Sequence, residues 1–277
     1  MKNPIPLALA LLASAYVGQA SAKPLNICLQ PSDRIAQTVG CDSTIQPVIA
    51  YNENAVEFVE RQMKQPGNVM LWIGKEDWAH LPRWRNRNFV AVLAAAAPYI
   101  AAGKTTHVYV QDEADLCSTG PCPGRDTYLI NLATTLAHAA GLKTAITIAP
   151  MVILDPGFIL PNIDVIGIDP YYVTAQSAGD CQMSANPTAN LWKCSVARLR
   201  AKGFTGQLVF VGAGFGLVTD THEFRMMYLQ LQVDAYLQSN ADGVMAYYCH
   251  YDPQVAATEP NLVPLCSTQY APYVTPN

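Results

Sequence analysis

Short apolar runs alternate with helical patterns along most of this chain. Eight of these runs are continuous enough in aliphatic and β-branched residues to predict strands that are buried on both faces. The predicted strands are residues 25–30, 47–51, 69–74, 107–113, 144–150, 164–170, 207–212 and 243–249.

Helix signals separate most of the predicted strands. Asn54 and Glu57 form the pattern of a capping box, which predicts a helix to about residue 64. Three further patterns end at a glycine, which accepts the left-handed conformation that terminates many helices. These helices are predicted at residues 88–102, 127–140 and 191–202, and a last one at 220–239.

Strands that alternate with helices predict a parallel sheet covered by helices. Eight such units most simply close into a (β/α)8 TIM barrel, and residues 23–277 have the usual length for one such domain. An open doubly wound sheet is the alternative. Few residues lie between the strands at 144–150 and 164–170, so we expect one unit to lack a full helix.

The first 22 residues have the layout of a secretory signal peptide. Lys2 precedes an apolar run that ends at Val17, and Ala20-Ser21-Ala22 has the small-x-small form of a cleavage site. The run is short for a bilayer span, although an uncleaved anchor is the alternative. The sequence therefore predicts an exported protein, periplasmic or extracellular, without a membrane span.

The cysteine count supports export. All eight cysteines follow the predicted signal peptide, and an even number in an exported chain predicts disulfides. Pairing of sequence neighbours would close one loop each, which suggests Cys28–Cys41, Cys117–Cys122, Cys181–Cys194 and Cys249–Cys266. The sequence alone leaves the other pairings open.

The net charge and the absence of known motifs argue against several classes of binding partner and cofactor. The chain has 17 basic and 21 acidic residues and a formal net charge of −4, which argues against nucleic acid or an anionic membrane as a partner. The cysteines form no C-x-x-C pair and the histidines are scattered, so no metal site is predicted. The glycines at 212–216 lack the dinucleotide spacing, and no cofactor is expected.

The predicted strand at 107–113 ends on two adjacent carboxylates, Asp112 and Glu113. In a (β/α)8 barrel the reaction site lies at the C-terminal ends of the strands, where Asp169 also falls. Acids together with aromatic side chains suit a carbohydrate, because aromatic faces stack on sugars and carboxylates bind hydroxyls or transfer protons. The predicted substrate contacts are Asp112, Trp78, Tyr172, Tyr248 and His250. Trp72 is expected in the core, and Asp115 is expected in solvent or at a helix start.

These strand ends resemble a known family. Asp112-Glu113, the "DVIGIDPYY" stretch at 164–172 and "FG" at 215–216 look like the retaining (β/α)8 glycoside hydrolases related to family 5. The resemblance implies that Glu113 is the general acid/base. It also implies that Asp112 occupies the place of an Asn that contacts a sugar hydroxyl.

One position departs from the family. Its nucleophile is a Glu after the seventh strand, where this chain has Gly214. Asp169 is then the candidate for the second carboxylate. Two alternatives stay open: a substrate-assisted hydrolase of the hexosaminidase type, in which Asp112 orients an acetamido group, and a carbohydrate-binding barrel without catalysis. A protein-binding factor is a third class, for which the sequence offers no positive signal.

Overall fold

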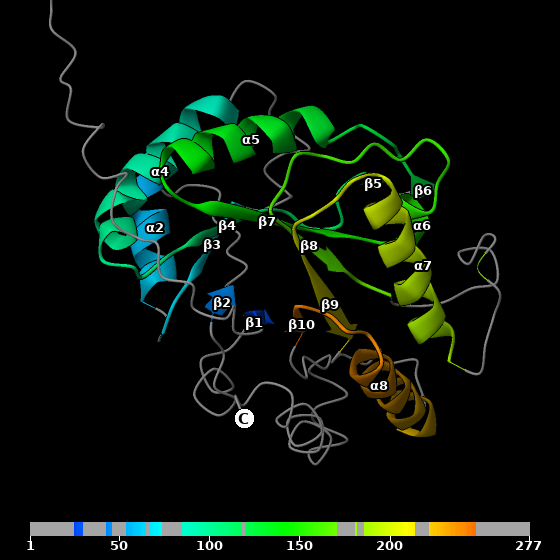
Figure 1. Cartoon of the computed structure of the whole chain (residues 1–277). Coiled ribbons are helices and arrows are strands. Elements are labelled where there is room, and N and C mark those ends of the chain that lie inside the picture. The colour runs from blue at the N-terminus through cyan, green and yellow to red at the C-terminus, as the bar shows by residue number, and fades with distance from the viewer. Residues whose placement is uncertain are drawn as a thin grey trace, which may run out of the picture.

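The computed structural model describes residues 25–29, 43–45, 54–64, 67–73, 85–117, 120–170, 181, 186–213 and 222–247. Within these residues, parallel strands form one sheet with helices along one of its faces (Figure 1). The strands of this sheet are β1 (Leu25–Leu29), β2 (Ser43–Ile45), β3 (Met70–Trp72), β4 (His107–Gln111), β7 (Lys143–Ile148), β8 (Val165–Ile168), β9 (Gln207–Ala213) and β10 (Gly243–Tyr247).

The strand order places strands that follow one another in the chain mostly side by side. It runs β2-β1-β10-β9-β8-β7-β4-β3, and every recorded pairing between these strands is parallel. The end strands β2 and β3 approach each other, without strand pairing among their described residues. The predicted mixed α/β class with a parallel sheet is therefore confirmed.

The helices match the predicted segments closely. They are α2 (Ala55–Met63), α4 (Arg85–Ala101), α5 (Thr127–Ala139), α6 (Pro150–Ile153), α7 (Pro187–Ala201) and α8 (His222–Leu237). Asn54 caps α2, since its side chain accepts from Glu57 N at 3.0 Å and Glu57 Oε2 accepts from Asn54 N at 3.1 Å. The unit after β7 has the single turn α6, as its short length predicted.

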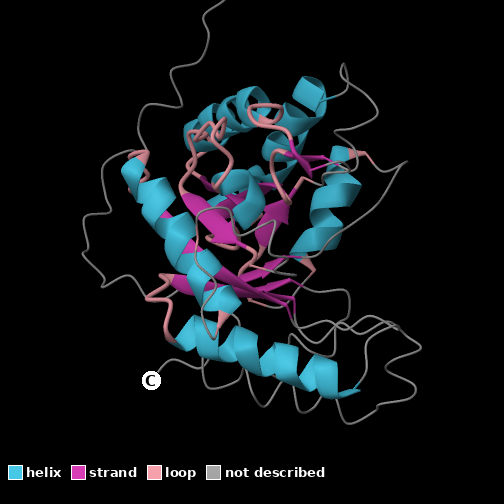
Figure 2. Ribbon diagram, turned by 90° about the vertical axis from the view of Figure 1, so that its right-hand side faces the viewer, coloured by secondary structure: helices cyan, strands magenta, loops and turns pink. Residues whose placement is uncertain are grey.

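Two apolar clusters lie on opposite faces of the sheet. The outer cluster joins strand residues such as Val108 and Ile166 to helix residues such as Val59, Ile130 and Trp192. The inner cluster consists of strand residues, Met70, Tyr109, Ala145, Val165, Val209, Val211 and Met245. Helices lie outside the strands in both views (Figures 1 and 2), so we call the face with the second cluster the inner face.

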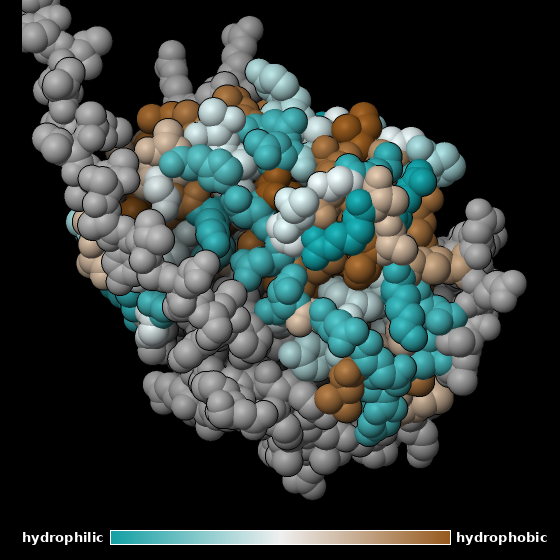
Figure 3. Space-filling view, viewed as in Figure 1, coloured by the Kyte–Doolittle hydropathy of each residue, from teal (hydrophilic) through white to brown (hydrophobic). Residues whose placement is uncertain are grey.

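The outer surface mixes polar and apolar side chains. Hydrophilic and hydrophobic residues are interspersed on the face shown in Figure 3. Tyr128 on α5 is 74% exposed and Leu237 on α8 is 58% exposed, and single apolar side chains of this kind are normal on a protein surface. In the part of the chain described, no helix is long and apolar enough to cross a membrane.

One predicted strand lies outside the described residues, and the structure has a short strand nearby that was not predicted. The sequence placed the second strand at residues 47–51, which lie outside the described residues, and the structure has β2 at Ser43–Ile45. The other predicted strands agree with the structure to within a few residues at their ends. The hairpin of β5 (Leu116–Cys117) and β6 (Gly120–Pro121) was not predicted.

Two of the suggested disulfides are present. Cys117 pairs with Cys122 across the β5–β6 hairpin, and Cys181 pairs with Cys194 on α7. Cys41, Cys249 and Cys266 lie outside the described residues, so the pairings Cys28–Cys41 and Cys249–Cys266 stay predictions.

Candidate functional site

Asp112 and Glu113 lie at the C-terminal edge of the sheet. They follow β4 directly, and Asp169 follows β8, with β7 paired between the two strands. Because the strands are parallel, the ends of β4, β7 and β8 meet at the same edge. The two predicted catalytic residues, Glu113 and Asp169, therefore lie at one edge of the sheet, two strands apart.

An irregularity in β4 determines which acid turns toward the inner face. Tyr109 pairs with Ala145, but Gln111 pairs with Ile146, so one residue of β4 is extra in the pairing with β7. Such a bulge reverses the side-chain alternation of the strand beyond it. Asp112 consequently lies on the face of Tyr109, where strict alternation would have placed Gln111.

Two buried hydroxyls hold Asp112. Tyr109 Oη donates to Asp112 Oδ1 at 2.8 Å, and Thr147 Oγ1 on β7 donates to the same oxygen at 2.6 Å. Tyr109 is 1% exposed and Thr147 is fully buried, so both donors are fixed by packing. Asp112 itself is partly exposed. The carboxylate therefore lies at the boundary between the inner packing and solvent.

Glu113 has an unusual backbone. Its φ is 43°, in the left-handed region that residues other than glycine adopt rarely. Thr147 fixes this turn twice: its Oγ1 accepts from Glu113 N at 2.8 Å, and its carbonyl oxygen accepts from Ala114 N at 2.8 Å. The side chain of Glu113 is partly exposed at this turn. An acid in that position is accessible to a ligand from solvent.

Asp169 is more deeply buried than Asp112 and Glu113. It is 3% exposed and follows Ile168, the last residue of β8. Ile166 and Ile168 belong to the outer cluster, whereas Val165 belongs to the inner one. Continued alternation places Asp169 on the inner face, as the neighbour of Gly167 on that face. The sheet thus brings Asp169 to the same face and edge as Asp112.

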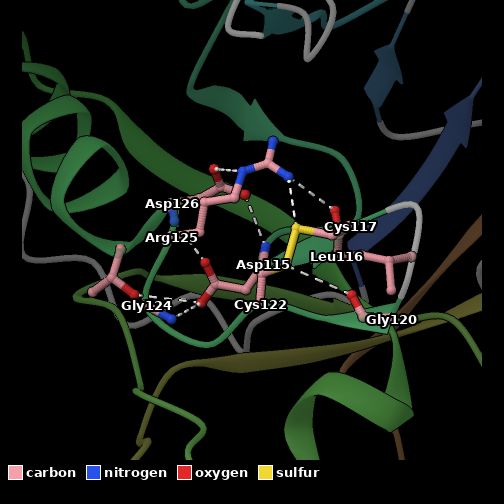
Figure 4. Close-up of polar contacts among 9 residues, drawn as sticks. Asp115, Leu116, Cys117, Gly120, Cys122, Gly124, Arg125 and Asp126 are labelled. Carbon is pink, nitrogen blue, oxygen red and sulfur yellow. Dashed lines mark hydrogen bonds and ion pairs between the residues drawn. A yellow bond between two sulfur atoms is a disulfide. The ribbon is translucent and has the colours of Figure 1, made fainter.

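The loop after Glu113 is anchored to the start of α5 (Figure 4). Asp115 Oδ1 accepts from Asp126 N at 2.6 Å, and its Oδ2 accepts from Gly124 N at 3.0 Å. Asp115 N donates in turn to Asp126 Oδ2 at 2.9 Å. Asp115 is 3% exposed, so the expectation of a solvated acid is wrong, and the alternative of a contact at a helix start is correct.

Burial affects the titration of this anchor. Removal from water raises the pKa of Asp115 above its usual value, and the charge of Asp126 raises it further. The backbone N–H groups of Asp126 and Gly124 lower the pKa, but burial outweighs them. The hydrogen bonds of Asp115 therefore attach the turn at Asp112 and Glu113 to the start of α5, but they require the Asp115 carboxylate to be removed from water.

A disulfide closes the same loop. Cys117–Cys122 spans the β5–β6 hairpin, and Arg125 Nη1 lies 3.1 Å from Cys117 Sγ (Figure 4). Arg125 Nε lies 3.4 Å from Asp126 Oδ1. The disulfide and the Asp115 anchor restrict the segment that begins at Glu113.

Trp72 was assigned to the core from the sequence, and the structure places it at the edge of the inner cluster. Its side chain is partly exposed and packs against that cluster, with its ring centroid 6.5 Å from that of Tyr109. Gln62 on α2 fixes its backbone, accepting from Trp72 N at 2.8 Å and donating to Trp72 O at 3.0 Å. Trp72 is the last residue of β3, which places it at the same edge of the sheet as Asp112.

The remaining predicted contacts lie outside the described residues. These are Trp78, Tyr172, Tyr248 and His250, and Gly214 lies outside as well. Among the residues that are described, no group of His, Cys, Asp and Glu has the arrangement of a metal site.

Comparisons with known proteins give a likeness at the level of fold. No protein-family model and no curated protein sequence matches the chain. A GH18 chitinase from Pseudoalteromonas aurantia aligns with a TM-score of 0.51 at 11% identity, over 88% of this chain and 99% of that one. A family 5 glycoside hydrolase from Prevotella bryantii gives 0.52 at 12%, over 87% and 86%. The fold resembles that of glycoside hydrolases.

A third solved structure aligns with this chain over only part of its own length. Catalytic domain 2 of a group II chitinase from Ostrinia furnacalis gives a TM-score of 0.43 at 12% identity, and the alignment covers 69% of this chain and 64% of that one. The described part of β9 ends at Ala213 and contains no carboxylate.

Proposed function

We propose that this chain is an exported, disulfide-stabilised (β/α)8 glycoside hydrolase-like protein that cleaves a glycosidic bond in a poly- or oligosaccharide. Glu113 is the general acid/base, and Asp169 is the second carboxylate. Trp72, together with Trp78, Tyr172, Tyr248 and His250, would contact the sugar beside Asp112.

The observation that carries the proposal is the acidic turn after β4. A left-handed Glu113 held through its N–H by a buried threonine is a constrained arrangement, and such strain is common at functional sites. A surface acid without a role would need neither the strained backbone nor the fixed carboxylate of Asp112 beside it. Two of the aligned structures, both with TM-scores above 0.5, are glycoside hydrolases, which supports the choice of reaction class.

The proposed chemistry needs two acids across the sugar. Glu113 would donate a proton to the glycosidic oxygen as the bond to the anomeric carbon breaks. In a retaining reaction Asp169 would attack that carbon as the bond breaks, and water deprotonated by Glu113 would then hydrolyse the glycosyl-enzyme ester and release Asp169. In an inverting reaction Asp169 would instead deprotonate the water that attacks the carbon. Carboxyl groups about 5–5.5 Å apart would give retention of configuration, and groups about 6.5–9.5 Å apart would give inversion.

Export is part of the proposal because of the disulfides. Cys117–Cys122 and Cys181–Cys194 are bonds of the kind that persist in an oxidising compartment. They support the periplasmic or extracellular location that the segment 1–22 predicts.

A carbohydrate-binding barrel without catalysis is the second candidate. Gly214, which stands in the sequence where the family has its strand-seven Glu, favours it, because hydrolysis with a strand-seven nucleophile would need a carboxylate there. The substrate-assisted route is a third possibility that also needs no acid on β9, with Asp112 orienting the acetamido group of the substrate.

A test compares wild type, Glu113→Gln and the control Glu60→Gln, which changes an exposed acid on α2. The probes are hexasaccharides of β-1,4-linked glucose, mannose and N-acetylglucosamine. Cleavage by the wild type and by the control, with a loss of about 10²–10⁴-fold in Glu113→Gln, supports the hydrolase. Calorimetric binding of a probe without cleavage by any of the three proteins would replace the hydrolase with the binding barrel.

A further inference from the structure

One threonine contacts both members of the acidic turn. Thr147 Oγ1 lies 2.6 Å from Asp112 Oδ1 and 2.8 Å from Glu113 N. Thr147 comes from β7 and is fully buried, whereas the acids follow β4, some 35 positions earlier in the chain. A single hydroxyl therefore fixes the carboxylate of Asp112 and the backbone of Glu113 relative to each other.

The hydrogen bonds around this hydroxyl assign its proton. The N–H of Glu113 donates to Thr147 Oγ1, so the oxygen is an acceptor there and its own hydrogen goes to Asp112 Oδ1. Tyr109 Oη lies 2.8 Å from Asp112 Oδ1 and 3.0 Å from Thr147 Oγ1, and the carboxyl oxygen is the closer acceptor. Asp112 Oδ1 then receives two O–H donors.

We propose that Tyr109 and Thr147 are positioning residues that hold Asp112 as a hydrogen-bond acceptor. Asp112 would accept from a hydroxyl or amide N–H of the carbohydrate, which leaves Glu113 as the residue of the pair that donates the proton. This inference rests on the proposed function, which assigns the roles of Asp112 and Glu113, and it adds the two residues that position Asp112.

The packing around Thr147 keeps its hydroxyl in place. A β-branched side chain has few accessible χ1 rotamers, so a neighbour that fixes the methyl group also fixes the hydroxyl. Gly167 on β8 supplies the room for that methyl: a Cβ at Gly167 would lie 2.9 Å from Thr147 Cγ2 and 2.8 Å from Val211 Cγ2. The glycine, the threonine and the tyrosine thus form one arrangement beneath Asp112.

The kinetic test uses Thr147→Val, which keeps the shape and removes the hydroxyl, and Thr147→Ser, which keeps the hydroxyl. Thr134→Val is the matched control, because Thr134 is fully buried and its hydroxyl bonds that of Thr144 at 3.2 Å. The same three hexasaccharides are the probes.

We expect kcat to fall about 30–100-fold in Thr147→Val with KM within about 3-fold of wild type. Thr147→Ser should restore kcat to within about 3-fold, and Thr134→Val should leave kcat unchanged. A kcat in Thr147→Val equal to that of the wild type would overturn the inference and leave the proposed function standing.

Tyr109→Phe gives a second arm: if Thr147→Val does not fold, kcat should still fall in Tyr109→Phe, which removes the other donor to Asp112 Oδ1, and an unchanged kcat would overturn the inference. Where both single variants fold, a double-mutant cycle tests the shared role. Because both hydroxyls act on Asp112 Oδ1, the loss in Tyr109→Phe/Thr147→Val should be smaller than the product of the two single losses. A loss equal to that product would mean that the two residues act independently, which contradicts the shared role.

Hydrogen exchange separates this inference from the proposed function. The amide of Glu113 should exchange at least about tenfold faster in Thr147→Val than in wild type or Thr147→Ser, because its acceptor is gone. This measurement needs no substrate. If the wild type cleaves none of the probes, the proposed function fails, and equal exchange in all three proteins would then overturn the positioning role as well.

Discussion

The anchor between Asp115 and the start of α5 gives a quantitative prediction. In Asp115→Ala, the N–H groups of Asp126 and Gly124 lose acceptors at 2.6 and 3.0 Å. A buried donor left without an acceptor costs about 1–3 kcal/mol, so the two together amount to about 2–6 kcal/mol at most. Burial raises the pKa of Asp115, which means that the wild type pays to bury this carboxylate at pH 7 and the variant does not. We therefore expect Asp115→Ala to lower the free energy of unfolding by about 2–3 kcal/mol.

Urea denaturation of the oxidised protein at pH 7 measures this loss. Asp155→Ala is the matched control, since Asp155 Oδ1 also accepts a backbone N–H, from Gly157 at 2.7 Å, but in an exposed loop. We expect less than about 1 kcal/mol for the control. If Asp115→Ala unfolds within about 0.5 kcal/mol of wild type, the claim that this contact fixes the loop after Glu113 is refuted.

Three further predictions concern the sheet and its edge. Asp169→Asn should lower kcat by at least about 10²-fold with little change in unfolding free energy, and a fully active variant would remove Asp169 from the mechanism. Gly167→Ala should cost about 1–3 kcal/mol in a denaturant titration, because the new methyl meets Thr147 and Val211; wild-type stability would show that the inner packing is looser than described. Burial, and after it the positive charge of Lys143, lowers the pKa of His107 to about 4. The neutral imidazole of the folded state therefore contributes its full stability above about pH 6.5, and this contribution is lost as the pH falls through 4. That lowering corresponds to about 3 kcal/mol, and His107→Gln should flatten the dependence of unfolding free energy on pH in this window; an unchanged slope would contradict the buried neutral imidazole.

Local signals predicted most of the fold. The capping box at Asn54 and Glu57 specifies the start of α2 through contacts within one turn, so the sequence contains all the information needed. Gly141 and Gly203 follow α5 and α7 with φ of 79° and 89°, as a helix terminator requires. The strands were predictable because burial on both faces demands continuous apolar runs.

The site depended on contacts that the sequence does not show. The bulge in β4 exists in the pairing with β7, and no glycine or proline marks it between Tyr109 and Gln111. Strict alternation would therefore have assigned the inner face to the wrong residues. The burial of Asp115 was missed for a similar reason, because its donors belong to the start of α5, and an isolated acid in a turn gives no sign of them.

The most direct measurement is a crystal structure of Glu113→Gln with a bound hexasaccharide. The account predicts a glycosidic oxygen within hydrogen-bond distance of the residue 113 side chain, a sugar donor on Asp112, and carboxyl carbons of residues 113 and 169 about 5–10 Å apart. A sugar bound away from the ends of β4 and β8, or a separation well beyond about 10 Å, would contradict it.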